Sequence, residues 1–454
     1  MVIKKENLPG SICTFLIVAC LLSLPIYSFA QADAGYQSLT LRQCIDYAMK
    51  HQPALNQSLI NQAITRANNA INLSGWYPQV NASATLTHYD VLPSAFETNP
   101  NNPAGPPVIV KTGIPNSVTP QISATQAFIS PSLIYAAKTA PLFTEQAKLV
   151  TDSTKINLVA TVSKAFYNVL LTLEQIDVLK ADTAELSRSV TDAYHQYIGG
   201  IVDETDYEEA TITLNNMLVQ LRQAVENVTP QYAALKQLLG FPADKQFNIS
   251  FDTSEMIRNI GIDSSEQLQY EKRIEFQQLQ TAKKLQQHLI NYYHLSFLPT
   301  LSGFLNYNYE FGSNEFSSLF DNSYPYSSLG LTLNFPVFTG FSRINNVRKA
   351  RLQADLLNWS EVNLKSQIYS EYSTALANYR SNLFSFHTMQ KNVELAKRVY
   401  TVVEMQYKQG IVPYLNVITA QSNLITSETG YINALFQVLS YKIDLQKAMG
   451  EISY

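Results

Sequence analysis

The densest group of chemically active side chains is a run of carboxylates near the middle of the chain. Five acids fall within seven residues, directly after a Gly-Gly pair: Asp203, Glu204, Asp206, Glu208 and Glu209. At the start of a helix, acids are stabilised by the N-terminal dipole, so a solvated helix start is one interpretation. The other is a negatively charged collar that attracts cations and docks a basic partner. The run alone leaves both open.

The other reactive side chains form no catalytic or metal-binding pattern. The six histidines are scattered, without HExxH spacing, and His288 and His294 are a poor helical pair at six residues apart. Glu208 and Glu209 are adjacent, so on a helix they point to opposite sides. Neither a GxSxG motif nor a P-loop occurs. The sequence therefore predicts a protein that is not an enzyme and needs no cofactor or metal.

Composition bears on the partners and the compartment. Charged residues make up 15% of the chain, below the roughly 25% usual for soluble proteins. The net charge is −4 and no basic stripe is present, so we expect no nucleic-acid partner.

The N-terminus is typical of a secretory signal. Two lysines precede an apolar run over residues 11–27, and the small-x-small triplet at 28–30 marks a cleavage site. We expect residues 1–30 to be a signal peptide. The segment ending at Cys20 also resembles a lipoprotein box, and lipidation of Cys20 is the alternative. The mature chain keeps only Cys44, which lies on an apolar helix face and should be buried and inert.

The chain repeats itself. YIGGIVDETDYEEA at 197–210 aligns with YKQGIVPYLNVITA at 407–420, and LKQLLG at 235–240 aligns with LQKAMG at 445–450. Several matches in one order indicate duplication of a structural unit. We expect the domains to follow this duplication: a first repeat at 31–242, a linker at 243–265 and a second repeat at 266–454.

Each half has the same order of elements: helix, strand, loop, strand, very long helix, turn, helix. The long helix of the first half is expected from Pro131 to Gly199, about 100 Å at ~1.5 Å per residue. Glycines mark the two turns that follow the long helices: Gly199, Gly200 and Gly410. Prolines mark the junctions between helices and strands: Pro78, Pro131, Pro299 and Pro336. Residues 91–116 hold six prolines and are expected to form an exposed loop.

The four strands alternate apolar and polar residues. In the segment 300–311, Leu305, Tyr307 and Tyr309 share a face opposite Asn306 and Asn308. Their length and pattern suit tilted membrane strands, although two hairpins on a soluble core are the alternative. After the signal we see no apolar stretch long enough for a membrane helix. A set of aromatic residues would suit an interfacial girdle: Trp76, Tyr77, Tyr292, Tyr293, Tyr324 and Tyr326.

Four strands cannot close a barrel, and open strand edges are not tolerated in hydrocarbon. Several chains must therefore contribute to one barrel, and the long helices must pack lengthwise against neighbouring subunits. The expected fold class is an α+β membrane protein in which a short β-barrel continues into a helical barrel.

The chain resembles the TolC-type outer-membrane efflux proteins over essentially its whole mature length. The resemblance rests on LTLRQCIDYAMKHQPAL, GWYPQV, SFLPTL, LNFPVFTGFSRINNV and the two turn motifs, in this order. It implies a homotrimer with a twelve-stranded barrel in the outer membrane and a helical tunnel through the periplasm. It also implies docking onto a periplasmic adaptor and, through it, an inner-membrane pump.

The resemblance also assigns a gate at the periplasmic mouth. Asp206 and Tyr407 match the positions of a phenol–carboxylate hydrogen bond, and Thr205 matches a position that accepts from an arginine. Val412 stands where that arginine would be. The family's inward-facing aspartates are replaced by Asn416 and Thr419.

The function expected is an outer-membrane channel subunit of a tripartite efflux or type I secretion system. The alternative from another class is a periplasmic structural or adhesin-like coiled-coil binding protein. The exported substrate, the cognate adaptor and the cation selectivity of the mouth are not encoded in any motif of the sequence.

Overall fold

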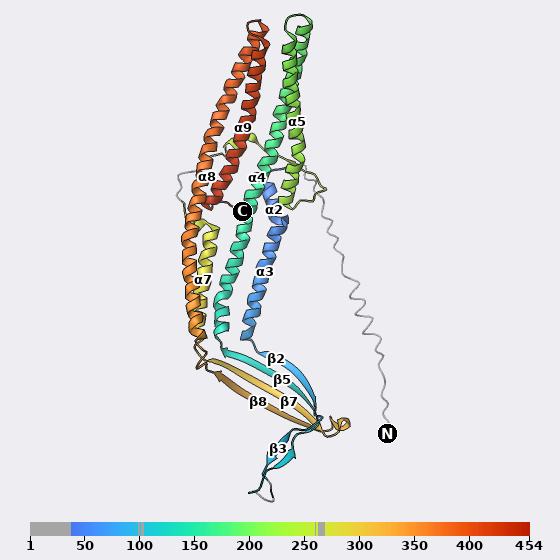
Figure 1. Ribbon diagram of the computed structural model, residues 1–454, viewed down its shortest axis with the longest axis vertical. Helices are drawn as coiled ribbons and strands as arrows, with labels where there is room; N and C mark the ends of the chain where they lie inside the picture. The colour runs from blue at the N-terminus through green and yellow to red at the C-terminus, as the bar shows by residue number, and fades with distance from the viewer. Residues whose placement is uncertain (1–37, 99, 101–103, 259, 262–267) are drawn as a thin grey trace, which may run out of the picture.

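A computed structural model describes residues 38–454 except 99, 101–103, 259 and 262–267 (Figure 1). The expected signal peptide at 1–30 and Cys20 lie outside these residues. The described chain is an elongated α+β molecule, in which long helices stand on one end of a curved four-stranded sheet.

Two long helical hairpins dominate the molecule. The first consists of α4 (Pro131–Ile198, 68 residues) and α5 (Glu204–Leu239, 36 residues). The second consists of α8 (Ser342–Lys408, 67 residues) and α9 (Tyr414–Met449, 36 residues). The lengths of the helices agree between the two hairpins, as the sequence repeat predicts. Proline is tolerated at the first turn of α4 because the N–H there has no helical partner.

Shorter helices fill the other half of the layer. Thr40 caps α2 (Leu41–His51) and forms a capping box with Gln43, and Pro53 occupies the first position of α3 (Pro53–Leu73). In the second half of the chain, α7 (Ile274–Leu295) is the counterpart of α3. The remaining short elements are β1 (Ser38–Leu39), η1 (Ser74–Trp76), β6 (Asn248–Ile249), α6 (Thr253–Arg258), η2 (Tyr270–Lys272) and η3 (Phe316–Ser318).

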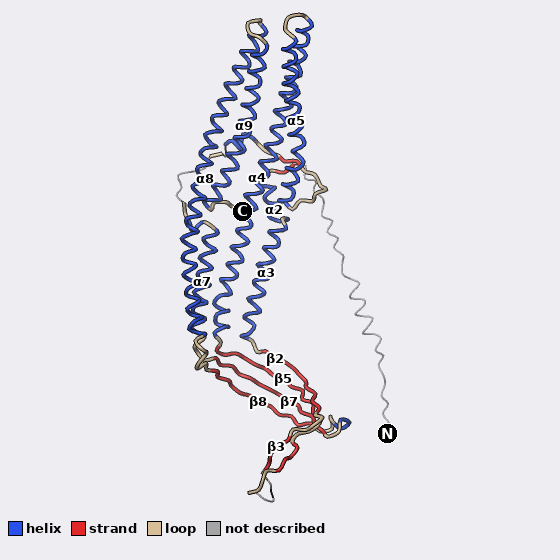
Figure 2. The backbone as a smooth tube through the Cα atoms, in the orientation of Figure 1, coloured by secondary structure: helices blue, strands red, loops and turns tan. Residues whose placement is uncertain are grey.

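The helices lie side by side in one curved layer rather than around a closed core (Figure 2). The central helix α4 packs against α3 and α7 near the sheet, and against α5 and α9 toward the hairpin tips. Helix α8 packs against α7 and α9. The layer therefore has two free edges, formed by α3 and α5 on one side and by α8 on the other.

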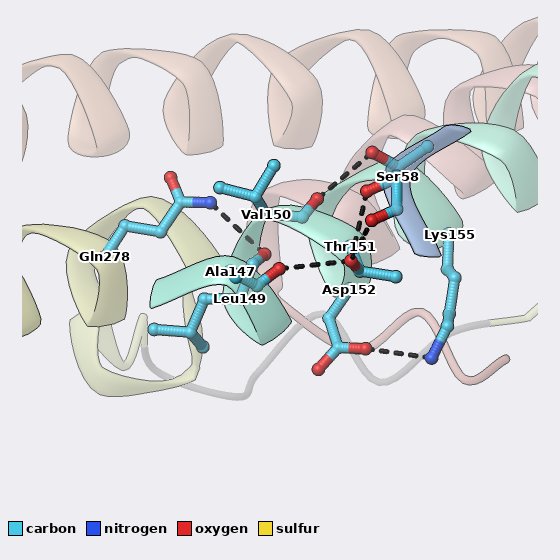
Figure 3. A network of polar contacts seen from close by, with 9 residues as sticks. Ser58, Ala147, Leu149, Val150, Thr151, Asp152, Lys155 and Gln278 are labelled. Atoms are coloured by element: carbon cyan, nitrogen blue, oxygen red, sulfur yellow. Dashed lines mark hydrogen bonds and ion pairs between the residues drawn. The ribbon is translucent and has the colours of Figure 1, made fainter. Parts of the chain in front are cut away.

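Polar contacts fix α4 to α3 and α7 near the ends of those two helices that lie away from the sheet (Figure 3). The hydroxyls of Ser58 on α3 and Thr151 on α4 are 3.0 Å apart, and Thr151 also donates to the carbonyl of Ala147. From α7, Gln278 Nε2 donates to the carbonyl of Leu149 at 3.2 Å. These bonds fix the longitudinal position of α3 and α7 along the central helix.

The main hydrophobic core lies where helices of the two halves of the chain meet, halfway along the molecule. It includes Phe166 and Leu170 of α4, Leu239 of α5 and Leu445 of α9, all nearly inaccessible to solvent. Cys44 of α2 is completely buried in this core, and burial raises the pKa of its thiol to about 12. The expectation of a buried thiol is confirmed, and the raised pKa agrees with the expectation that it is inert.

The sheet is antiparallel with the order β2-β5-β7-β8. Its strands are β2 (Gln79–His88), β5 (Asn116–Ile129), β7 (Thr300–Ser313) and β8 (Ser323–Asn334). The segment expected as a loop at 91–116 also contains a small hairpin of β3 (Ser94–Glu97) and β4 (Val108–Lys111). The edge strands β2 and β8 pair on one side only.

The register separates the residues of the sheet into two faces. Leu305 pairs with Ala124 and Leu329, whereas Asn306 pairs with Ser123 and Ser328. One face is therefore apolar and the other polar, as the alternation predicts. The tyrosines of β8 differ from the girdle expectation: Tyr324 and Tyr326 pair with Glu310 and Asn308, which places them on the polar face.

One helix has the composition of a membrane span. Within α4 an 18-residue stretch has a mean hydropathy of 1.4, and half of this stretch is buried inside the protein. The expectation that no such stretch follows the signal is wrong in composition. Because α4 packs against α3, α5, α7 and α9, its apolar residues contact the other helices of the layer.

Candidate functional site: the free ends of the helical hairpins

The two hairpin turns have the same backbone geometry. Gly200 and Gly410 adopt φ values of 71° and 72°, in the left-handed region that glycine enters without strain. In each turn the N–H three residues after the end of the helix bonds back to a carbonyl five residues earlier: Ile201 to Gln196 and Ile411 to Gln406, both at 2.9 Å. Gly199 caps the end of α4 with ordinary helical angles.

The acidic run lies on one hairpin only. Asp203 is the N-cap of α5, and four members of the run are exposed: Asp203, Glu204, Glu208 and Glu209. Asp206 is half-buried, and Thr205 is exposed. The first turn of α9 contains no acid. Of the two helices that begin at the tips, only α5 therefore has acids in its first turn, where the helix dipole favours them.

Aromatic side chains fill the interior of the tips. Tyr197 and Tyr207 stack with their ring centroids 6.4 Å apart inside the first hairpin. Tyr407 and Tyr414 lie 5.2 Å apart inside the second hairpin. A small apolar cluster, which includes Ala193 of α4 together with residues of α5 and α9, packs between them.

Between the two hairpins, apolar packing of α4 against α9 is accompanied by polar contacts, and we call these polar contacts the polar seam. Its cross-hairpin hydrogen bonds run from Tyr400 to Glu185, from Tyr407 to Gln196 and from Gln175 to Asn433. Further from the tips, Lys164 forms an ion pair with Asp444. The seam thus connects α4 to both α8 and α9 along most of the hairpin length.

Tyr407 therefore has a different partner from the one that the resemblance implies. Its hydroxyl donates to Oε1 of Gln196. Gln196 and Asp206 both belong to the first hairpin. Burial raises the pKa of Tyr407, and the nearby carboxylates of Asp206 and Asp192 raise it further. Asp206 is thus close to the phenol without being its acceptor in this chain.

Asp182 of α4 is a buried carboxyl group beside the polar seam. Its residue surface is 8% exposed, and Oδ2 has no hydrogen-bond partner. Burial and the carboxylates of Glu428 and Glu185 raise its pKa to about 7, while Lys397 acts in the opposite direction. Lys397 is already paired with Glu428 at 3.4 Å. Asp182 is consequently a buried acid that is protonated more easily than a surface aspartate.

The junction prolines lie between helices and strands. Pro78 immediately precedes β2 and Pro299 immediately precedes β7. Pro131 is the first residue of α4, and Pro336 lies in the connection from β8 to α8. These prolines stop one type of backbone hydrogen bonding before the next begins.

Among the described residues, no three His, Cys, Asp or Glu side chains are placed to hold a metal ion. Each hairpin is joined internally by apolar packing, such as that of Ile176 and Leu179 against Met217. The two hairpins are joined to each other by the cross-hairpin hydrogen bonds and by apolar packing, such as that of Ala193 on α4 with Val417 and Ile418 on α9.

Sequence reasoning identified the turns but missed most of the seam. Glu185, Gln196 and Asp182 belong to no motif, and the hydrogen-bond partners of Glu185 and Gln196 lie more than 200 residues away. Two of those partners, Tyr400 and Tyr407, are seven residues apart on α8. This spacing of tyrosines on one helix face is the signal that could have indicated the seam.

Comparisons with known proteins give a consistent result. The pattern of a family described as outer membrane efflux protein matches residues 44–241 and 270–451. The probable efflux pump outer membrane protein TtgC of Pseudomonas putida is 24% identical over 98% of this chain and 95% of that protein. The outer membrane protein TolC of Vibrio cholerae is 21% identical over 73% of this chain and 76% of its own length.

A solved structure gives the same fold. The outer membrane protein VceC from Vibrio cholerae superposes with a TM-score of 0.71 at 14% identity, covering 90% of this chain and 96% of that one.

Proposed function

This chain belongs to the outer membrane efflux protein family, and on that premise we propose that it is the channel subunit of a tripartite efflux or type I secretion system. In this proposal it forms a homotrimeric duct that crosses the outer membrane as a twelve-stranded barrel and extends through the periplasm as a helical tunnel. A periplasmic adaptor docks on the tunnel, and an inner-membrane pump is engaged through that adaptor.

The observation that carries the proposal is the open sheet. Strands β2 and β8 are both unpaired on their outer sides, and the apolar face is strongly exposed, with Leu329 82% and Leu331 71% accessible. An apolar face of this kind is stable against lipid, and unpaired edges in lipid must be closed. Pairing β2 of one subunit with β8 of the next closes the sheet and leaves lipid outside.

The helix layer supports the same assembly. Its free edges, α3 and α5 on one side and α8 on the other, lie above β2 and β8 (Figure 1). Exposed apolar residues line both edges, including Ile60 and Ile64 on α3 and Leu352 and Leu356 on α8. Because the two edges differ, the interface is head-to-tail, and rotation closes it into a ring.

The periplasmic mouth is then formed by the hairpin tips. Opening would separate the two hairpins along the polar seam. The acidic run on α5 is a suitable contact for a basic adaptor tip. The alternative, a coiled-coil binding protein that does not enter a membrane, does not explain why the apolar face of the sheet is exposed.

Two measurements on detergent-purified protein test the proposal together: the mass of the protein and its conductance in planar lipid bilayers. We expect a species of three chains that gives discrete, long-lived channels of small conductance. A monomer without channel activity contradicts the duct and favours the coiled-coil binding protein.

A further inference from the structure

The polar face of the sheet contains an aromatic group that lipid contact does not explain. β7 begins and β8 ends near the helices, where Thr300 pairs with Asn334. Tyr326 and Tyr324 pair with Asn308 and Glu310 at the opposite end of the same two strands. The two tyrosines therefore lie at the end of the sheet that is far from the helices.

These two rings are available to a ligand. Tyr324 is 57% exposed and Tyr326 is 52% exposed, on a face whose other members are mostly amides and hydroxyls. Within the described part of the chain neither ring stacks on another aromatic side chain. On the opposite face at the same level, Tyr309 lies 5.2 Å from Phe311, as expected of a lipid-facing girdle.

The chemistry of the group favours cations. The face of a tyrosine ring carries partial negative charge and attracts ammonium groups, quaternary ones included. The carboxylate of Glu310 is directly across the strand pair from Tyr324 and adds a full negative charge. Lysine and arginine are absent from β7 and β8, so no basic side chain of these strands opposes it.

From this geometry we infer that Tyr324, Tyr326 and Glu310 form a binding site for organic cations on the inner wall of the barrel, at its outer end. The inference rests on the proposed function, since the polar face becomes an inner wall only when the barrel closes. Threefold assembly repeats the site around one opening. Solutes leaving the duct would then meet a last selective region of aromatic rings and carboxylates.

The test is block of the single-channel current by tetraethylammonium, added to the barrel side of the full-length protein in planar bilayers. We expect concentration-dependent block of the unmodified channel. The Tyr324→Ala/Tyr326→Ala double variant should weaken block about tenfold, because two exposed cation–π contacts are lost. The Tyr324→Phe/Tyr326→Phe variant should keep most of the block, since the ring faces remain.

Tyr307→Ala is the matched control, because Tyr307 lies on the same strand pair but on the apolar face, opposite Ser327. It should leave block unchanged, while Glu310→Gln should weaken it. If tetraethylammonium does not block the channel, or the double alanine variant is blocked like the parent, the site is excluded although the duct stands. Absence of any channel contradicts the proposed function itself.

Discussion

The hydroxyl of Tyr407 on α8 donates a hydrogen bond to Oε1 of Gln196 on α4, joining the tips of two hairpins across 211 residues of sequence. Few other polar contacts hold the tips together. A bond of this kind contributes about 1 kcal/mol to the packed arrangement. Its loss should therefore be measurable as a shift between closed and open states.

Tyr407→Phe removes only the donor and keeps the ring against Tyr414. We expect the open fraction in single-channel recordings to rise about fivefold, in line with one lost hydrogen bond. Tyr197→Phe is the control, because Tyr197 stacks within the first hairpin. Gln196→Ala should reproduce the Tyr407→Phe effect. If Asp206→Ala does so and Gln196→Ala does not, the phenol–carboxylate latch of the family is the contact that matters.

The buried carboxyl of Asp182 should make the seam sensitive to pH. Its pKa is raised to about 7 from the ordinary value of 3.8, mainly by burial and by Glu428 and Glu185. A raised pKa means that the packed state is favoured while Asp182 is protonated. This contribution is complete below about pH 4 and is lost as the pH rises through about 7.

We therefore expect channel opening to increase between about pH 4 and pH 7, by up to about tenfold. Asp182→Asn should abolish that dependence and keep the closed state favoured, because the amide is neutral at every pH. Bilayer recordings over this pH range measure both. Asp177→Asn is the control, since Asp177 lies on the same helix and is exposed. An Asp182→Asn channel with the parental pH profile would assign the dependence to another group.

Two glycines with the same backbone angle should differ in their tolerance of a side chain. Gly240 has φ 67°, and a Cβ there would lie 2.5 Å from the carbonyl oxygen of His51. Gly410 has φ 72° and nothing within 4 Å of such an atom. Gly410→Ala should cost about 1 kcal/mol, from the left-handed conformation alone. Gly240→Ala should cost at least twice as much. Thermal unfolding in detergent compares them, and equal losses would contradict the close approach.

Cysteine cross-linking should reveal whether β2 meets β8 of another subunit. Ser83→Cys on β2 would be combined in turn with Ser328→Cys and Thr332→Cys on β8, all on the polar face. We expect oxidised dimers and trimers on non-reducing gels from at least one combination, and none from the single variants. Cys44 provides no background because it is fully buried. Monomers from every combination would argue against closure through these edges.

Local chemistry accounts for the elements that the sequence predicted. Proline at the start of α3 and α4, the capping box at Thr40, and glycine after α5 and α9 all act within a few residues. The alternation in β7 likewise assigned its two faces. Such signals need no knowledge of distant parts of the chain.

The contacts between the hairpins could not be predicted in the same way. Whether Tyr407 meets Gln196 or Asp206 depends on how α8 is rotated and shifted against α4, and packing of the whole layer decides this. The placement of Tyr324 and Tyr326 depended on register: a shift of one residue would move both rings to the lipid face.

The long helices α4 and α8 have nearly the same length, 68 and 67 residues. At ~1.5 Å per residue, both hairpin tips stand about 100 Å from the sheet. In the proposed duct, the distance between the outer membrane and a docking partner is thus set by both halves of the chain. We expect that lengthening the proposed duct requires matched insertions in both halves of the chain, because an insertion in one alone would leave the two tips at different heights.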